Sequence, residues 1–244
     1  MIHFKQLDLM LRLNPSSLSY ILGNQLIMEN AHLRHIFSNQ LLMLIRNRLL
    51  DQTLHRSNSG SISLGSALSL FLIANKSSPS LIAEVGTYIG NSAASMGLGA
   101  ALNGEPIHLI TCDLNQCIQE PLKSISLPEG SKVKVMNSSS TKMFEHLASH
   151  NLQIDMLHLD GRLLKDDIIP LKKLIKSETI IALDDCEGDE KGHMNLDLLR
   201  RNGLIQNHAY VQPFSKEIFQ TWNLETSSLT GFLMPVQSIR FTRQ

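Results

Sequence analysis

The chain has 244 residues, 43% of them hydrophobic and 18% charged, a composition that is typical of a globular protein and excludes a mostly disordered one. Its 22 Lys and Arg residues balance its 22 Asp and Glu residues, so the totals lack the basic excess expected of a protein with nucleic acid or a membrane surface as partner. Three cysteines are too few for a disulfide framework, which favours a reduced cytoplasmic protein. The sequence also lacks the apolar run of about 20 residues that a membrane span needs.

The first 60 residues are predicted to form a helical appendage. Their apolar side chains recur at three- and four-residue steps, as on one helix face: Leu33, Ile36, Phe37, Leu41, Leu44 and Ile45. The small, polar run Arg56–Ser63 marks a joint, which divides the chain into an appendage (1–60) and a main domain (61–244). Apolar residues on the appendage favour a homodimer, although packing on their own domain would give the same pattern.

After the joint, short apolar runs alternate with amphipathic segments. Strands are predicted at Leu81–Val85, His108–Asp113, Lys132–Met136, Ile154–Asp160 and Thr179–Asp184. Helices are predicted at Gly90–Leu102, Gln116–Ser124, Thr141–His150 and Leu164–Ile175. This alternation predicts an α/β fold in which a parallel sheet, apolar throughout, carries helices on both faces. Ligands of such folds bind at the carboxyl ends of the strands.

The first strand leads into a glycine-containing turn, Glu84–Ser92 (EVGTYIGNS). Gly86 and Gly90 permit a tight turn and a close approach of ligand to backbone, and the next helix directs free N–H groups at that ligand. The spacing is G-x-x-x-G instead of the G-x-G-x-x-G of dinucleotide sites. It suits an amino-acid carboxylate and a nucleoside without phosphates, as in S-adenosylmethionine, although such glycines also occur for purely structural reasons.

Acidic residues lie at the carboxyl ends of three of the predicted strands. Asp113 ends the second strand, where a carboxylate can accept both ribose hydroxyls of a nucleoside, or can cap the next helix. Asp160 ends the fourth strand, and Asp184 and Asp185 end the fifth, so three carboxylates would converge. Such a cluster is costly unless a cation neutralises it or one carboxylate is protonated, and hard oxygen ligands favour Mg²⁺ or a similar ion. The alternative is that Asp160 caps a turn and Asp185 is solvated.

In this order the motifs resemble those of class I S-adenosylmethionine-dependent methyltransferases, in their metal-dependent branch similar to catechol O-methyltransferase. The likeness covers about residues 60–235. Ser78–Leu81 followed by Glu84–Ser92 is similar to the family's glycine motif, Asp113 matches its ribose acid, and Val133–Leu147 aligns without a gap to its adenine segment. The run His158–Gly161 (HLDG) resembles a bacterial subgroup that methylates hydroxyls of sugars and secondary metabolites.

The resemblance implies a Rossmann-like class I methyltransferase sheet that uses S-adenosylmethionine and a divalent cation such as Mg²⁺. The expected reaction transfers a methyl group to a hydroxyl of a small-molecule substrate, such as a secondary metabolite, a sugar or a catechol. The expected metal ligands are Asp160, Asp184 and Asp185. The expected cofactor-binding residues are Glu84, Gly86, Tyr88, Gly90, Ser92, Asp113, Ser139, Ser140, Thr141 and Asp160.

One departure concerns the catalytic base. The family usually places Lys or His three residues after the strand-four Asp, where this chain has Leu163. Beside Asp160, the expected catalytic residues are therefore His193 and Lys165. As routes for removal of the substrate proton, we rank loss to water promoted by the metal first, His193 second and Lys165 third. His158 is expected to be a packed core histidine. Two alternatives remain, a non-catalytic relative and a nucleotide-dependent oxidoreductase, and the glycine spacing disfavours the latter.

The segment Pro213–Thr230, with Phe214, Phe219 and Trp222, is expected to shape the acceptor pocket together with the appendage, although Trp222 could equally be a core residue.

Overall fold

The computed structural model describes residues 62–115, 127–186, 191–205 and 230–233. The predicted appendage, the predicted helix Gln116–Ser124 and all of Pro213–Thr230 except its last residue lie outside these ranges. Within them, six strands form one sheet in the order β3-β2-β1-β4-β5-β6. The strands are β1 (Leu81–Val85), β2 (His108–Asp113), β3 (Lys132–Asn137), β4 (Ile154–Leu159), β5 (Ile175–Leu183) and β6 (Gly231–Leu233). The first five are parallel, and β6 is antiparallel to β5.

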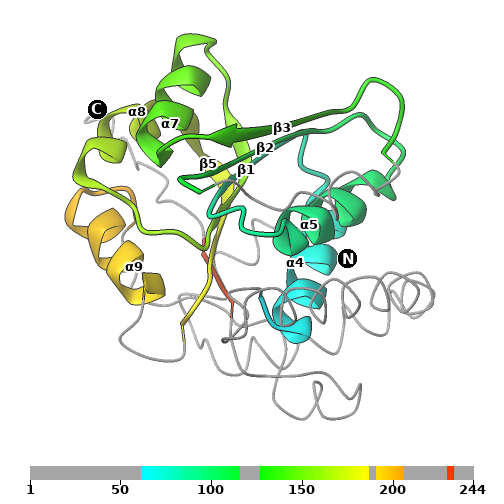
Figure 1. The fold of residues 1–244 in the computed structure, drawn as a ribbon, viewed down its shortest axis with the longest axis horizontal. Helices are drawn as coiled ribbons and strands as arrows, with labels where there is room; N and C mark the ends of the chain where they lie inside the picture. Colours follow the sequence, from blue (N-terminus) through cyan, green and yellow to red (C-terminus); the bar gives the residue numbers. More distant parts are fainter. Residues whose placement is uncertain (1–61, 116–126, 187–190, 206–229, 234–244) are drawn as a thin grey trace, which may run out of the picture.

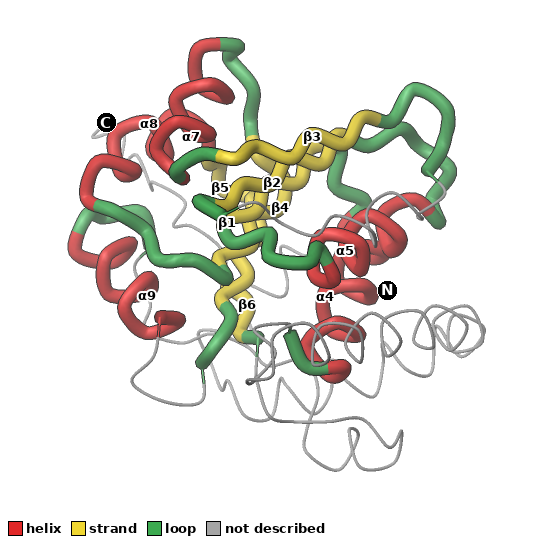
Figure 2. Tube along the Cα trace, viewed as in Figure 1, coloured by secondary structure: helices red, strands yellow, loops and turns green. Residues whose placement is uncertain are grey.

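Helices cover both faces of the sheet, as Figures 1 and 2 show. One layer contains α4 (Leu64–Ser77) and α5 (Asn91–Ala101), which pack against each other. The other contains α7 (Ser140–Ser149), α8 (Ile168–Leu174) and α9 (Lys191–Arg201), with the short 3₁₀ helix η1 (Lys165–Asp167) before α8. The predicted Rossmann-like α/β architecture is therefore confirmed.

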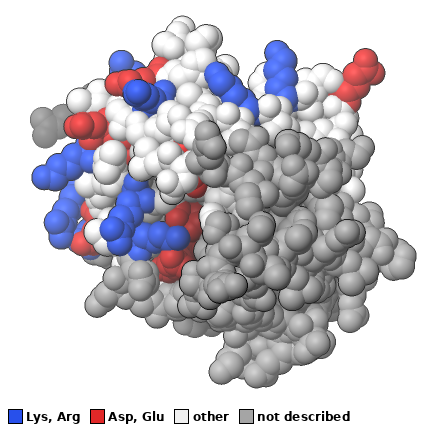
Figure 3. Space-filling view, in the orientation of Figure 1, with Lys and Arg blue, Asp and Glu red and all other residues white. Residues whose placement is uncertain are grey.

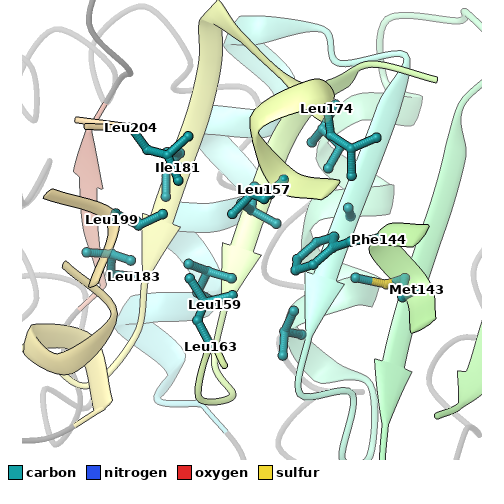
Figure 4. Close-up of a cluster of buried hydrophobic side chains, with 14 of the residues drawn as sticks. Met143, Phe144, Leu157, Leu159, Leu163, Leu174, Ile181, Leu183, Leu199 and Leu204 are labelled. Carbon is teal, nitrogen blue, oxygen red and sulfur yellow. The ribbon is translucent and has the colours of Figure 1, made fainter. Parts of the chain in front are cut away.

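The strand side chains alternate between two hydrophobic cores. On β1, Leu81, Ala83 and Val85 join the core beneath α7, α8 and α9, whereas Ile82 joins the core beneath α4 and α5. Figure 4 shows the first core, in which Phe144 of α7 lies among leucines of the sheet and of α8. Because alternate residues of a strand share a face, Glu84 lies on the α4–α5 side, together with Ile82.

The strand bounds follow the predictions closely at the centre of the sheet and less closely elsewhere. β1 and β2 match residue for residue, but β5 begins at Ile175 and takes the end of the predicted helix Leu164–Ile175. The expectation that all strands are apolar on both faces is wrong for β3. This strand forms an edge, and its lysines Lys132 and Lys134 are exposed.

Positive and negative side chains are mixed on one face of the described residues (Figure 3), in agreement with the balanced charge of the sequence. On the face drawn in Figure 3, Lys and Arg side chains lie beside Asp and Glu side chains instead of gathering in a patch of one sign. Within the described ranges, no helix combines the length and the hydrophobicity that crossing a membrane requires.

Candidate functional site

The turn after β1 lies directly against the loop after β4. Gly86 has a φ of +98°, and its N–H donates a hydrogen bond to the carbonyl of Cys112 at 2.9 Å. A Cβ atom on Gly86 would lie 2.8 Å from the nitrogen of Gly161 and 2.9 Å from the carbonyl carbon of Asp160. A side chain would therefore separate the two loops, and glycine lets their backbones meet at the carboxyl ends of the central strands.

Asp113 ties this turn to the end of β2. Its Oδ2 accepts a hydrogen bond from the backbone N–H of Tyr88 at 2.9 Å, and its Oδ1 accepts one from the N–H of Asn115 at 2.9 Å. The side chain is half-buried, and each carboxylate oxygen has a second lone pair. Tyr88 and Gly90 both have positive φ, and Gly90 is the N-cap of α5, which contains the buried Ser92. The predicted ribose acid and glycine turn are thus adjacent.

Glu84 lies beneath the turn in a buried polar row across three strands. It is paired in register with Thr111 of β2 and His158 of β4. Its Oε2 accepts a hydrogen bond from the Thr111 hydroxyl at 2.6 Å, and its Oε1 lies 2.9 Å from Nδ1 of His158. The Thr111 hydroxyl also lies 2.7 Å from that of Thr87 in the turn. Glu84 therefore supports the turn from below, and its side chain is fully buried.

His158 is fully buried, as predicted for a core histidine. Burial by itself lowers the pKa of its imidazole, but the hydrogen bond and the charge of Glu84 outweigh burial, and the pKa is raised. Among the described residues, no group hydrogen-bonds to its Nε2 atom.

The three hydroxyl residues predicted near the adenine form the start of α7. Ser139 is the N-cap, and its hydroxyl accepts a hydrogen bond from the N–H of Lys142 at 3.4 Å. Ser140 and Thr141 donate hydrogen bonds to the buried carboxylate of Asp167, at 2.7 and 2.5 Å. Asp167 also accepts from the N–H of Leu164 at 2.7 Å, so it fastens α7 to the segment after β4.

The three acids predicted as metal ligands do converge. One oxygen from each of Asp160, Asp184 and Asp185 lies within 4.8 Å of the others. Burial, followed by the charge of Asp184, raises the pKa of Asp160 to about 8, and burial also raises the pKa of Asp184. Asp184 accepts a hydrogen bond from the Thr230 hydroxyl at 3.0 Å. Carboxylate oxygens are hard donors, and three of them in this geometry fit a divalent cation such as Mg²⁺.

A lysine that the sequence analysis did not identify also reaches this cluster. Nζ of Lys191, the first residue of α9, lies 2.5 Å from Oδ1 of Asp160 and 3.0 Å from Oδ2 of Asp185. Burial lowers the pKa of this ammonium, but the charge of Asp160 outweighs burial and raises it. The one available signal was that Lys191 is the only basic residue in the acidic stretch from 184 to 191 (DDCEGDEK).

The residue at the family's base position and the two candidate bases differ in burial and in hydrogen bonding. Leu163 occupies the family's base position, but its side chain is buried in the core that Figure 4 shows. Its N–H donates to Oδ1 of Asn195 at 2.9 Å. Lys165 is exposed in η1 and forms no hydrogen bond or ion pair with the described acids of the cluster. His193 is half-buried, and its Nε2 lies 3.2 Å from the carbonyl oxygen of Cys186.

Comparison with protein families finds one match, over residues 83–186, to a family model described as a methyltransferase domain. The matched segment runs from β1 through the loop after β5 and therefore contains the glycine turn, Asp113 and all three acids of the cluster. Comparison with curated proteins finds no match.

Several solved structures share the fold at low sequence identity. S-adenosylhomocysteine-bound methyltransferase PaMTH1 from Podospora anserina is 15% identical, with a TM-score of 0.54, over 79% of this chain and 88% of its own. O-methyltransferase TomG from Streptomyces achromogenes, bound to S-adenosylmethionine, is 13% identical, with a TM-score of 0.54. The match covers 79% of this chain and 90% of TomG. An O-methyltransferase from Bacillus cereus, bound to S-adenosylhomocysteine, is 15% identical, with a TM-score of 0.50, over 66% and 76%.

Proposed function

We propose that this chain, whose residues 83–186 match a methyltransferase domain, transfers a methyl group from S-adenosylmethionine to a hydroxyl of a small molecule. The observation that carries the proposal is the meeting of three features at the carboxyl ends of neighbouring strands. These are the glycine turn after β1, the half-buried Asp113 at the end of β2, and the carboxylate cluster after β4 and β5. In parallel α/β sheets this edge is where ligands bind.

The cofactor would occupy the turn and Asp113. Close backbone approach at Gly86 and the N–H groups at the start of α5 suit the amino-acid end of S-adenosylmethionine. The free lone pairs of Asp113 suit the two ribose hydroxyls, and its bonds from Tyr88 and Asn115 hold the carboxylate in place. Ser139, Ser140 and Thr141 would contribute to the adenine site through the position of α7.

Asp160, Asp184 and Asp185 would hold a divalent cation, for which we favour Mg²⁺. When bound, the ion would lower the pKa of a substrate hydroxyl. The protein would align this oxygen with the methyl carbon of S-adenosylmethionine, so that the new carbon–oxygen bond would form as the carbon–sulfur bond breaks. The residues around the cluster then have to exclude competing water and orient the acceptor.

The acceptor would be a hydroxylated small molecule of the secondary-metabolite type, including sugars. TomG, which shares the fold, is involved in tomaymycin synthesis. This likeness and the HLDG run at His158–Gly161 both support that class. Turnover measured with a panel of sugars, phenols and catechols identifies the acceptor. Binding of S-adenosylhomocysteine without transfer to any acceptor would favour the non-catalytic alternative.

Asp113→Ala tests the cofactor site. We expect the affinity for S-adenosylhomocysteine to fall by about 2 kcal/mol, or roughly 30-fold, because two ribose hydroxyls lose their acceptor in a desolvated site. Isothermal titration calorimetry measures the change. The matched control is Asp197→Ala, which removes an exposed carboxylate of α9 that pairs with Arg200 and Arg201. Unchanged affinity in Asp113→Ala would remove this residue from the cofactor site.

The proton of the acceptor hydroxyl would pass first to water. His193 ranks second as proton acceptor, and Lys165 ranks third. Lys165 is exposed and has no bond to the cluster, so Lys165→Met is expected to change kcat less than about twofold. His193→Ala is expected to have a moderate effect, because the ring also contacts the carbonyl of Cys186. A pH–rate profile of both variants measures this, and a loss above about 100-fold in either would reverse the ranking.

A further inference from the structure

We propose that Lys191 is a built-in competitor of the divalent cation, so that ion binding requires its ammonium to leave the carboxylate cluster. This inference rests on the metal site in the proposed function. The ammonium lies 2.5 Å from Oδ1 of Asp160 and 3.0 Å from Oδ2 of Asp185, so it uses two of the three groups that would ligate the ion.

The position of Lys191 is set by the start of α9. A Cβ atom on Gly192 would lie 2.4 Å from the carbonyl oxygen of Asp184 and 2.7 Å from that of Asp185, so the helix backbone packs directly on the loop after β5. One turn further along, Asn195 donates to the carbonyl of Gly161 at 2.8 Å and accepts from the N–H of Leu163. These contacts hold α9 against both acid-bearing loops and direct its first residue to the cluster.

The competition follows from charge and from shared ligands. A divalent ion would take the same oxygens of Asp160 and Asp185, and two cations held by the same carboxylates repel each other strongly. The side chain of Lys191 can leave, because its four-carbon stem is flexible and 26% of its surface is exposed. In the ion-free protein the ammonium bonds to Asp160 and Asp185 and so stabilises the cluster.

Calorimetric titration of Mn²⁺, used as the probe ion, tests the competition in the full chain. Lys191→Met is expected to bind Mn²⁺ at least about tenfold more tightly than the parent, because a competing unit charge is lost next to the site. Lys191→Arg, which keeps the charge, is expected to retain the weaker binding. The matched control is Lys176→Met, which removes a similar ion pair, with Nζ 2.5 Å from Oδ1 of Asp155, away from the cluster.

Melting temperatures of the same samples give a second measurement. Without ions, Lys191→Met is expected to melt below the parent, since the cluster loses its cation, and saturating Mn²⁺ should raise its melting temperature by more than that of the parent. Calorimetry with S-adenosylhomocysteine shows that each variant is folded.

The outcomes separate this inference from the proposed function. Equal or weaker Mn²⁺ binding by Lys191→Met, with the parent binding the ion, overturns the competition and leaves the metal site standing. Binding of S-adenosylhomocysteine by both proteins, with no Mn²⁺ binding by either, overturns the competition and the metal site together, while methyl transfer from the cofactor site stands.

Discussion

Removal of divalent ions by a chelator is expected to reduce methyl transfer by at least about 100-fold, and added Mg²⁺ should restore it. The reason is the composition of the cluster. Asp160, Asp184 and Asp185 place three carboxylate oxygens within 4.8 Å of one another, and the ammonium of Lys191 bonds to Asp160 and Asp185. Without a divalent ion, the ammonium of Lys191 remains at this cluster, but two carboxylates already bind its single charge, so it would lower the pKa of the acceptor hydroxyl far less than a divalent ion would.

The measurement is the initial rate of methyl transfer in excess chelator and after addition of Mg²⁺. Asp184→Asn should show a comparable loss at ordinary Mg²⁺ concentration, whereas Asp197→Asn, on the exposed side of α9, should keep the parent rate. S-adenosylhomocysteine binding is followed in parallel to show that the cofactor site is intact. Full turnover in excess chelator would leave the carboxylates with a structural or cofactor-binding role.

Gly86→Ala is expected to destabilise the fold by about 3 kcal/mol and to weaken S-adenosylhomocysteine binding strongly. Two costs combine. The φ of +98° is unfavourable for an L residue, and the new Cβ would lie 2.8 Å from the nitrogen of Gly161, where backbone must move. Movement there displaces Asp160 as well, so the cofactor turn and the carboxylate cluster should be affected together.

Gly104→Ala is the matched control for backbone strain. Gly104 has a φ of +78°, but a Cβ atom on it would have no neighbour within 4 Å, so about 1 kcal/mol is expected from the dihedral alone. Urea-induced unfolding measures both variants, and the difference between them isolates the contact between the β1 turn and the β4 loop. Equal destabilisation by the two substitutions would mean that this contact is not tight.

Residues at the centre of the sheet were the easiest to predict. The bounds of β1 and β2 agree with the sequence because strands buried on both faces read as continuous apolar runs between polar turns. The prediction failed for α4, which was not recognised as a helix. In its sequence, LGSALSLFLIANKS, Ser66 and Ser69 are buried beside apolar residues, since α4 packs on both the sheet and α5, and the helix therefore lacks a clear amphipathic period.

By itself, the sequence determined the fold class and the convergence of Asp160, Asp184 and Asp185, because apolar runs are local and parallel strands end at a common edge. The pairing of side chains was decided only by the tertiary structure. Glu84 meets His158 across 74 residues, and Lys191 meets Asp160 across 31. These contacts depend on strand register and on the packing of Gly192 against the β5 loop, which arise from long-range contacts that no local pattern specifies.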